Sequence, residues 1–180
     1  MNTINLNIKK FAISSLFVGL ATIFSIFLIP LTLPFGGKIT FFSMMMISMP
    51  AYYFGIKIGF VASFAFSLIM MVLDSYIIHP VQVIFDYTIA FGCFGIVAFF
   101  RDKHNGLIIG FTVACIIRFI SHSISGYIFF KDYAPENWNA IIYVIVYNGS
   151  FVFTECVFSL LVMMTGPVKK IIEYYKMQLE

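Results

Sequence analysis

Charged residues are scarce in this sequence: Asp, Glu, Lys and Arg make up 11% of its 180 residues. Soluble domains usually carry about 25%. The apolar residues, at 61%, are too many for a soluble fold to bury. This balance excludes a water-soluble enzyme and a disordered chain. The formal net charge is +3, but the basic residues are scattered in ones and twos, which excludes a nucleic-acid-binding surface.

Cysteine is also rare, and no two cysteines are close enough to form a CxxC pair. Cys93, Cys115 and Cys156 lie in separate apolar stretches, so we expect neither a redox motif nor a metal site. We interpret them as small buried side chains. The glycines at residues 36–37 precede a lysine, but no Ser or Thr follows it, so this is not an ATP-binding loop. We therefore expect neither a cofactor nor an enzymatic activity.

Long apolar runs fill most of the chain. A membrane-spanning helix needs about 20 apolar residues, and the charged residues divide this sequence into six such stretches. The first is too long for a signal peptide and no cleavage site follows it. We expect an all-α membrane protein with six transmembrane helices in a single domain, residues 1–180. The six stretches are residues 11–33, 39–54, 58–73, 80–100, 107–130 and 138–164.

The distribution of Lys and Arg predicts the orientation in the membrane. Six helices would place eight of these residues on the side of the two termini and two on the other side. Because basic residues favour the cytoplasmic side, we expect both termini in the cytoplasm. The eight are Lys9, Lys10, Lys57, Arg101, Lys103, Lys169, Lys170 and Lys176, and the two are Lys38 and Lys131.

Three of the apolar stretches carry polar side chains four residues apart. Such pairs share one face of a helix, and a polar face inside a membrane must turn away from lipid. We therefore expect the three faces to meet, near the outer side. The pairs are Gln82 with Asp86, Arg118 with His122, and Tyr143 with Tyr147, which has Asn148 beside it.

Two interpretations of these polar faces are open. An Asp86–Arg118 ion pair could simply hold the helices together, or the faces could line a ligand pocket open to the outside. We favour the pocket, because three polar faces exceed what helix packing requires. Two roles are open for Glu155: it could line the floor of the pocket, or it could pair with a group that the sequence does not identify.

The residue types indicate the chemistry of the ligand. Asp86 can accept hydrogen bonds from an amine or balance a cation, while His122 and Asn148 can bind a polar edge. Aromatic rings can stack on a flat heterocycle or on a cation. A small, flat, nitrogen-containing and cationic molecule fits this set. The aromatic candidates are Tyr87, Phe130, Trp138 and Tyr143.

Five segments of the sequence form one recognisable series. They are residues 33–40, 79–87, 118–126 and 133–136, and Tyr143 with residues 147–150. In this order and spacing they resemble the ThiT family of thiamine-binding S components of energy-coupling factor (ECF) transporters, and the resemblance covers almost the whole chain. It implies a six-helix, S-component-like bundle in the plasma membrane of a bacterium that binds thiamine near the outer face.

The resemblance also implies partners. These are a membrane coupling subunit and two cytoplasmic ATPases, which alone would use ATP while the S component topples in the lipid bilayer to deliver its vitamin. Ser15 and Gly19 match the small-residue patch by which such subunits dock on the coupling subunit. The loop at residues 34–40, with its two glycines, is a candidate lid over the ligand.

The resemblance assigns ligand contacts residue by residue. Asp86 matches the acidic residue that contacts the aminopyrimidine of thiamine, and Arg118 matches a basic position one turn before the histidine. Phe130 and Gly37 stand near positions where some members have Trp, which leaves vitamin B6 or a pyrimidine precursor open as the ligand. The full ligand-binding set is Gln82, Asp86, Tyr87, Arg118, His122, Phe130, Trp138, Tyr143 and Asn148.

Two further functions compete with this interpretation. A stand-alone carrier could couple vitamin uptake to protons through Asp86 or Glu155. Alternatively, a structural protein without a ligand would need Asp86 for folding alone.

Overall fold

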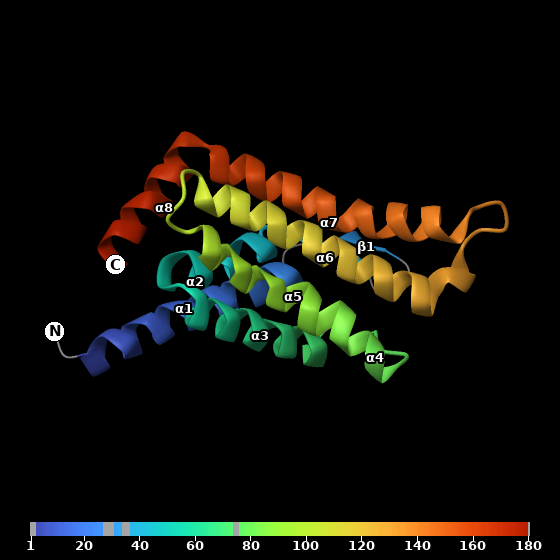
Figure 1. The fold of residues 1–180 in the computed structure, drawn as a ribbon, viewed down its shortest axis with the longest axis horizontal. Helices are drawn as coiled ribbons and strands as arrows, with labels where there is room; N and C mark the ends of the chain where they lie inside the picture. The colour runs from blue at the N-terminus through green and yellow to red at the C-terminus, as the bar shows by residue number, and fades with distance from the viewer. Residues whose placement is uncertain (1–2, 27–30, 34–36, 74–75, 180) are drawn as a thin grey trace.

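The computed structural model describes residues 3–26, 31–33, 37–73 and 76–179. Within these ranges the chain is almost entirely helical, with one short pair of strands, so the expected all-α fold class is confirmed (Figure 1). In chain order the elements are α1 (Thr3–Ile26), β1 (Leu31–Thr32), β2 (Lys38–Ile39), α2 (Ser43–Phe54), α3 (Ile56–Leu73), α4 (Pro80–Val83), η2 (Ile84–Ile89), α5 (Ala90–Gly92), η3 (Cys93–Phe100), α6 (Gly106–Phe130), η4 (Lys131–Tyr133), α7 (Ala140–Met164) and α8 (Gly166–Leu179).

The first apolar stretch is not a single helix. Helix α1 begins before the predicted boundary and ends at Ile26. Strand β1 then pairs antiparallel with β2, with Leu31 opposite Ile39 and Thr32 opposite Lys38. The helix prediction for residues 11–33 therefore failed at its C-terminal end, where β-branched and apolar residues pair as strands instead.

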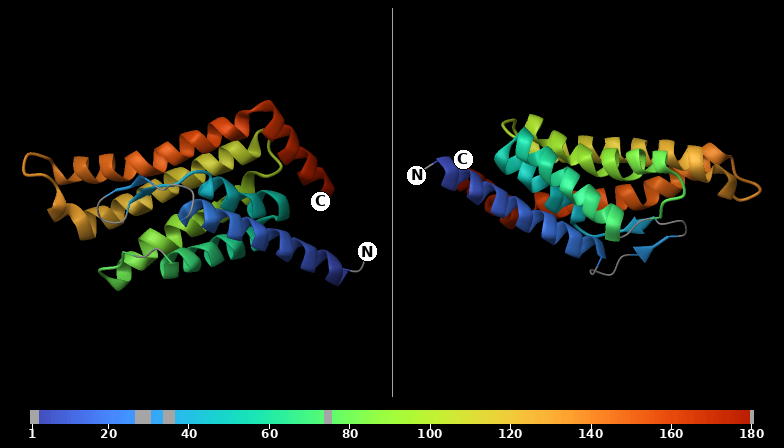
Figure 2. Two further views of the ribbon diagram at one scale, coloured as in Figure 1. Left: turned by 180° about the vertical axis from the view of Figure 1, so that it is seen from behind. Right: turned by 90° about the horizontal axis from the view of Figure 1, so that it is seen from below.

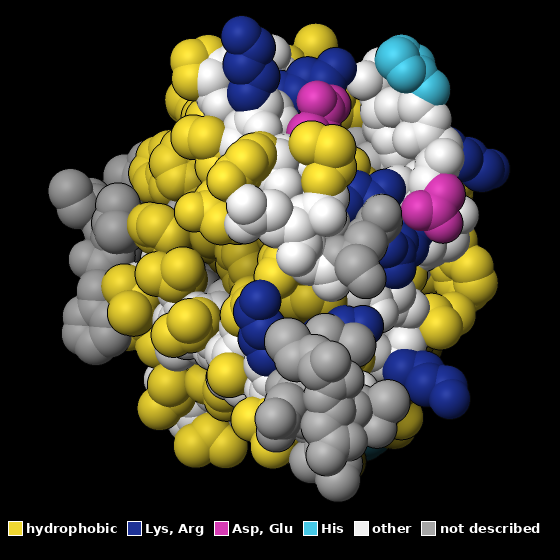
Figure 3. Space-filling view, turned by 90° about the vertical axis from the view of Figure 1, so that its left-hand side faces the viewer, with side chains coloured by type: hydrophobic (Ala, Val, Ile, Leu, Met, Phe, Trp, Pro, Cys, Tyr) yellow, Lys and Arg dark blue, Asp and Glu magenta, His cyan; other side chains and the backbone are white. Residues whose placement is uncertain are grey.

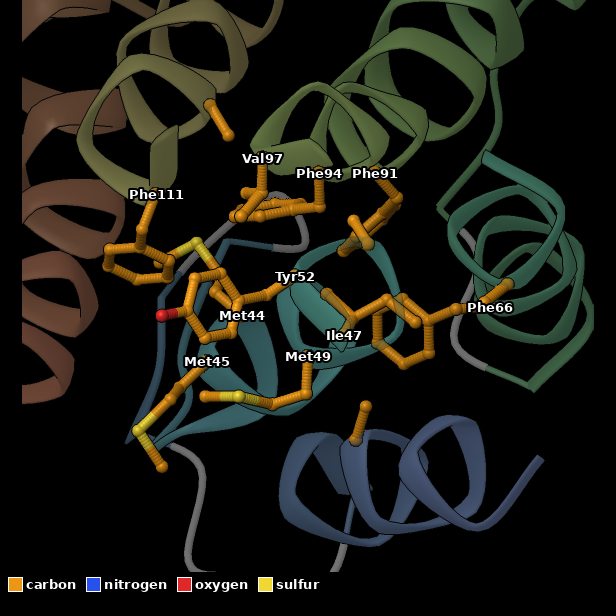
Figure 4. Packing of buried hydrophobic residues seen from close by; sticks show 14 of the residues in the cluster. Met44, Met45, Ile47, Met49, Tyr52, Phe66, Phe91, Phe94, Val97 and Phe111 are labelled. Carbon is orange, nitrogen blue, oxygen red and sulfur yellow. The ribbon is translucent and has the colours of Figure 1, made fainter. Parts of the chain in front are cut away.

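Helix α2 is short and buried. Its 12 residues span about 18 Å, which is less than the apolar thickness of a bilayer, about 30 Å. Gly55 has φ +83°, a conformation that glycine adopts without strain, and there the chain turns into α3. Figure 4 shows α2 side chains packed against the helices around it. The labelled α2 side chains are Met44, Met45, Ile47, Met49 and Tyr52, and they belong to the same buried cluster as Phe66, Phe91, Phe94, Val97 and Phe111.

Five helices in the described ranges are long and apolar enough to cross a membrane, and α2 is not one of them. The fold thus contains a buried helix where the sequence indicated a membrane span. The count of six crossings and the cytoplasmic position of the termini stay predictions. The five segments are Asn7–Ile26, Ile56–Leu73, Pro80–Phe100, Gly106–Tyr133 and Ala140–Met164.

The segment from Pro80 to Phe100 is irregular in its backbone. It changes from α to π geometry in η2, returns to α in α5 and tightens to a 3₁₀ helix in η3. The π turn contains Asp86, and Ser121 of α6 donates to the carbonyl of Phe85 at 2.7 Å. Such π turns are frequent at functional sites. The carbonyl of Phe85 also accepts from the amide of Ala90, so α6 adds a second donor to it.

Both termini lie at one end of the helical bundle (Figures 1 and 2). Helices α6 and α7 run antiparallel beside each other, and their connection lies at the opposite end, as does the start of α4. After α7, the extended residue Thr165 breaks the helix, and α8 crosses the end that carries the termini. Helix α8 lies beyond the six stretches recognised in the sequence.

Candidate functional site

A cavity of about 120 Å³ lies toward the end of the bundle opposite the termini. Segments from α4, η2, α6 and α7 line it, together with β2 and its neighbours. The three polar helix faces recognised in the sequence all reach it. Eight of the nine predicted ligand-binding residues line the cavity: Gln82, Asp86, Tyr87, Arg118, His122, Phe130, Tyr143 and Asn148.

Trp138 is the exception. It lies in the connection between η4 and α7, beyond the helix ends, and its side chain is 48% exposed. It does not line the cavity, so the structure does not bring it together with the other predicted ligand-binding residues. Tyr76, which the prediction did not include, does line the cavity, and its ring centroid lies 6.1 Å from that of Phe130.

The carboxylate of Asp86 joins η2 to α6. One of its oxygens lies 2.9 Å from Nδ1 of His122, and the other accepts a hydrogen bond from Ser125 at 2.8 Å. Among the described residues, Nε2 of His122 is buried without a hydrogen-bond partner. When Nδ1 donates its proton to Asp86, the neutral ring presents Nε2 as an acceptor. The carboxylate thus orients the imidazole with one nitrogen left for another molecule.

Arg118 does not pair with Asp86. Its side chain is 6% exposed, and its guanidinium carbon lies 4.4 Å from the centroid of the Phe91 ring. Nε and Nη1 have no hydrogen-bond partner within the described chain. The interpretation of an Asp86–Arg118 ion pair is therefore wrong, because His122 and Ser125 take the place of Arg118.

Gln82 and Tyr87 bind backbone as well as lining the cavity. The carboxamide of Gln82 accepts from the amide of Ile78 at 2.9 Å and donates to the carbonyl of Tyr76 at 2.8 Å. The hydroxyl of Tyr87 accepts from the amide of Tyr76 at 3.1 Å. Both side chains thus fix the segment that follows α3, which places the ring of Tyr76 at the cavity.

Tyr147 ties α7 to the segment before β2. Its hydroxyl accepts a hydrogen bond from the amide of Gly37 at 3.0 Å. A Cβ atom added at Gly37 would lie 2.5 Å from that hydroxyl, so the contact requires glycine here. Gly37 is thus matched by a tyrosine that reaches it from α7.

Glu155 caps a helix from a distance. It is 1% exposed and accepts hydrogen bonds from Thr40, from the hydroxyl of Ser43 at 2.7 Å and from the amide of Met44 at 2.9 Å. The N-cap residue of α2, Phe42, offers no side-chain acceptor. The first amides of a helix have no acceptor within the helix, and a carboxylate at this position supplies one. Its negative charge also interacts favourably with the positive end of the helix dipole. Sequence spacing could not reveal this, since the partners lie more than 100 residues away.

The predicted docking patch lies on an exposed part of α1. Ser15 and Gly19 are four residues apart, and a Cβ added at Gly19 would meet no atom within 4 Å. The surface is therefore accessible to a partner helix. The predicted lid lies partly outside the described residues, which resume at Gly37. Of its described part, Gly37, Lys38 and Thr40 line the cavity.

Comparisons with known proteins agree with this architecture. A sequence profile of the family described as thiamine transporter protein matches residues 11–174. The thiamine transporter ThiT of Bacillus subtilis (strain 168) is 29% identical over 155 residues, which cover 76% of this chain and 80% of that protein. The structure of ThiT from Listeria monocytogenes superposes with a TM-score of 0.70 at 19% identity, over 96% of this chain and 97% of that one, which shows a shared fold.

These matches confirm the resemblance noted in the sequence. The family, the shared fold and the apolar helices together make this a multi-pass membrane protein. Because the profile spans almost all of the sequence, the chain belongs to the thiamine transporter protein family.

Proposed function

We propose that this chain is the S component of an ECF importer and binds thiamine in the cavity between η2, α6 and α7. The observation that carries the proposal is the Asp86 carboxylate, held by His122 and Ser125 at a cavity with aromatic walls. Thiamine joins an aminopyrimidine to a cationic ring, and both parts suit this lining. The family match and the ThiT relatives support the choice of vitamin.

The side chains have separate roles in this proposal. Asp86 and Asn148 hydrogen-bond the heterocycle, and the acidic residue also offsets the positive charge of the ligand. Nε2 of His122 and the N–H groups of Arg118 bind polar edges of the ligand. The aromatic rings of Tyr87, Phe130 and Tyr143 form the walls.

Transport in this proposal requires partner proteins. The chain itself catalyses no reaction and holds no cofactor. A membrane coupling subunit docks on the α1 surface at Ser15 and Gly19, and two cytoplasmic ATPases supply the energy. Uptake in vesicles should therefore depend fully on the ATPase module. Uptake driven by a pH gradient with this chain alone would identify a proton-coupled carrier instead.

Calorimetric titration of the purified protein in detergent tests the ligand and the site together. Wild-type protein should bind thiamine saturably and bind pyridoxine far more weakly. Asp86→Asn should weaken thiamine binding about 10- to 100-fold, because a hydrogen bond to a buried charged group is worth about 1.5–3 kcal/mol. Asp132→Asn, an exposed carboxylate in η4, is the matched control and should bind like wild type.

Three results would count against the proposal. If wild-type protein showed no binding of thiamine, the proposal that it binds thiamine would be wrong. If it bound pyridoxine more tightly than thiamine, the ligand would be vitamin B6. Asp86→Asn could also lower the fraction of folded protein while the molecules that do fold bind thiamine normally. That result would assign Asp86 a role in folding alone.

A further inference from the structure

A second cavity lies at the end of the bundle that carries the termini, far from the candidate thiamine site. Its volume is about 300 Å³, and it lies between α8 and the turn that joins η3 to α6. Apolar side chains of three helices, α6, α7 and α8, form part of its wall. Its lining includes Leu107 and Ile108 of α6, Met163 of α7 and Ile172 of α8.

The remaining wall of this cavity is mainly basic. Four Lys or Arg side chains and one histidine line it, against two carboxylates. Figure 3, which views this end of the molecule, shows Lys and Arg side chains spread over the face with few acidic ones among them. The basic residues are Arg101, Lys103, His104, Lys169 and Lys176, and the acidic residues are Asp102 and Glu173.

The two carboxylates already have basic partners. Asp102 lies 3.5 Å from Arg101 and 3.5 Å from Lys176, and Glu173 lies 3.9 Å from Lys169. The amine of Lys103 has no acidic partner among the contacts of the described chain, where it lies 5.1 Å from the centroid of the Phe100 ring. The lining therefore carries an excess of positive charge, which favours an anionic ligand.

Helix α8 is placed to lie along the membrane surface. Helix α7 has 25 residues and is about 38 Å long, enough to cross the apolar layer, and α8 begins two residues after it ends. On one flank of α8, Ile171 and Tyr175 are 55% and 50% exposed. On the opposite flank, Lys169 faces the cavity. An apolar flank beside a basic one is typical of helices that lie in the lipid headgroup layer.

We propose that this cavity binds the phosphate headgroup of an anionic phospholipid, with Lys103 as its main cationic contact. Lys169, which lies 3.9 Å from Glu173 and donates to Asn105 at 3.2 Å, is the second. The apolar flank of α8 then lies against the acyl chains next to the bound headgroup. The Lys and Arg distribution predicts that this end faces the cytoplasm, where the leaflet carries anionic lipid. The site is separate from the thiamine cavity and does not depend on the function proposed for it.

Native mass spectrometry of the detergent-solubilised full chain tests this site with phosphatidylglycerol and phosphatidylcholine as probes. Wild-type protein should bind phosphatidylglycerol more tightly than phosphatidylcholine. The double substitution Lys103→Gln with Lys169→Gln should weaken phosphatidylglycerol binding about 10-fold or more and leave phosphatidylcholine binding unchanged. The control, Lys57→Gln with Lys170→Gln, removes the same charge from residues that do not line the cavity and should retain the preference. Melting temperatures should agree between the two double variants.

Several outcomes would overturn the proposal. Equal losses in the two double variants would mean that general surface charge, and not the cavity, attracts the lipid. Displacement of the lipid by millimolar inorganic phosphate would identify a soluble phosphate as the occupant. If the Lys103 and Lys169 substitutions left lipid binding intact but prevented assembly with the ATPase module, the surface would be a protein interface.

Discussion

Replacement of Glu155 by Gln should destabilise the start of α2 and, through it, the edge of the cavity proposed to bind thiamine. The buried carboxylate accepts three hydrogen bonds, and two of their donors, Thr40 and Ser43, also line the cavity. Gln has nearly the same shape, but it is neutral and has one acceptor oxygen in place of two. The substitution therefore removes charge without removing volume, which separates the electrostatic role of Glu155 from its packing.

The magnitude follows from the contacts that are lost. Gln can keep its oxygen toward Ser43 and the amide of Met44 while its NH₂ group faces Thr40, so the main loss is the charge assistance. Hydrogen bonds to charged groups are worth about 1.5–3 kcal/mol, so we expect a loss of about 2–3 kcal/mol of stability. Glu155→Leu leaves the amide of Met44 and one of the two hydroxyls unsatisfied, because the hydroxyls of Thr40 and Ser43 lie 3.0 Å apart and one can donate to the other. Its cost should exceed that of Glu155→Gln and reach about 4 kcal/mol or more.

Two measurements on detergent-solubilised protein test this account. Melting temperature should fall by about 4–12 °C for Glu155→Gln, at about 2–4 °C per kcal/mol for a chain of this size, and further for Glu155→Leu. Dissociation of thiamine should also become faster, because residues at the cavity edge lose their anchor. Glu136→Gln, an exposed carboxylate, is the control. A Glu155→Gln protein that melts within about 1 °C of the control and releases thiamine at the same rate would refute the reasoning.

Three other substitutions have expected outcomes. Gly37→Ala should weaken thiamine binding about 10-fold or more in calorimetry, because the added Cβ would displace the Tyr147 hydroxyl. The control is Gly92→Ala, where an added Cβ meets no atom within 4 Å, and it should leave thiamine binding unchanged. Arg118→Gln should weaken binding about 10-fold with little loss of melting temperature, because removing a buried unpaired charge offsets lost packing; a large loss of stability with normal binding would contradict this. Gly19→Leu should leave thiamine binding intact and abolish co-purification with the coupling subunit; unchanged co-purification would place docking elsewhere.

The sequence was sufficient to locate most of the cavity. Side chains four residues apart on a helix must share a face, so the pairs Gln82–Asp86 and Arg118–His122 indicated which surfaces meet. Periodicity does not determine how the polar atoms then pair. Arg118 and His122 lie on the same face of α6, and only the structure shows that Asp86 pairs with His122 and Ser125.

Other features depend on contacts distant in the sequence. Trp138 looked like an aromatic wall because it lies near the start of α7, yet the turn before that helix carries it away from the cavity. The apolar stretch that contains α2 looked like a membrane span because a buried helix and a lipid-facing helix have the same composition. The point at which α2 begins depends on Glu155 of α7, which accepts from the amide of Met44. Local sequence patterns do not encode such a contact.

The hydrogen bonds at the cavity also bear on the choice between a ligand site and polar residues that only hold helices together. Asp86, Ser125 and Nδ1 of His122 satisfy one another. Nε2 of His122 and two nitrogens of Arg118, Nε and Nη1, have no partner within the described chain, although both side chains are buried at the cavity wall. An unpaired buried polar atom costs about 1–3 kcal/mol. These atoms therefore favour the proposal that a polar ligand binds at this wall, and the calorimetric titration of Asp86→Asn tests it.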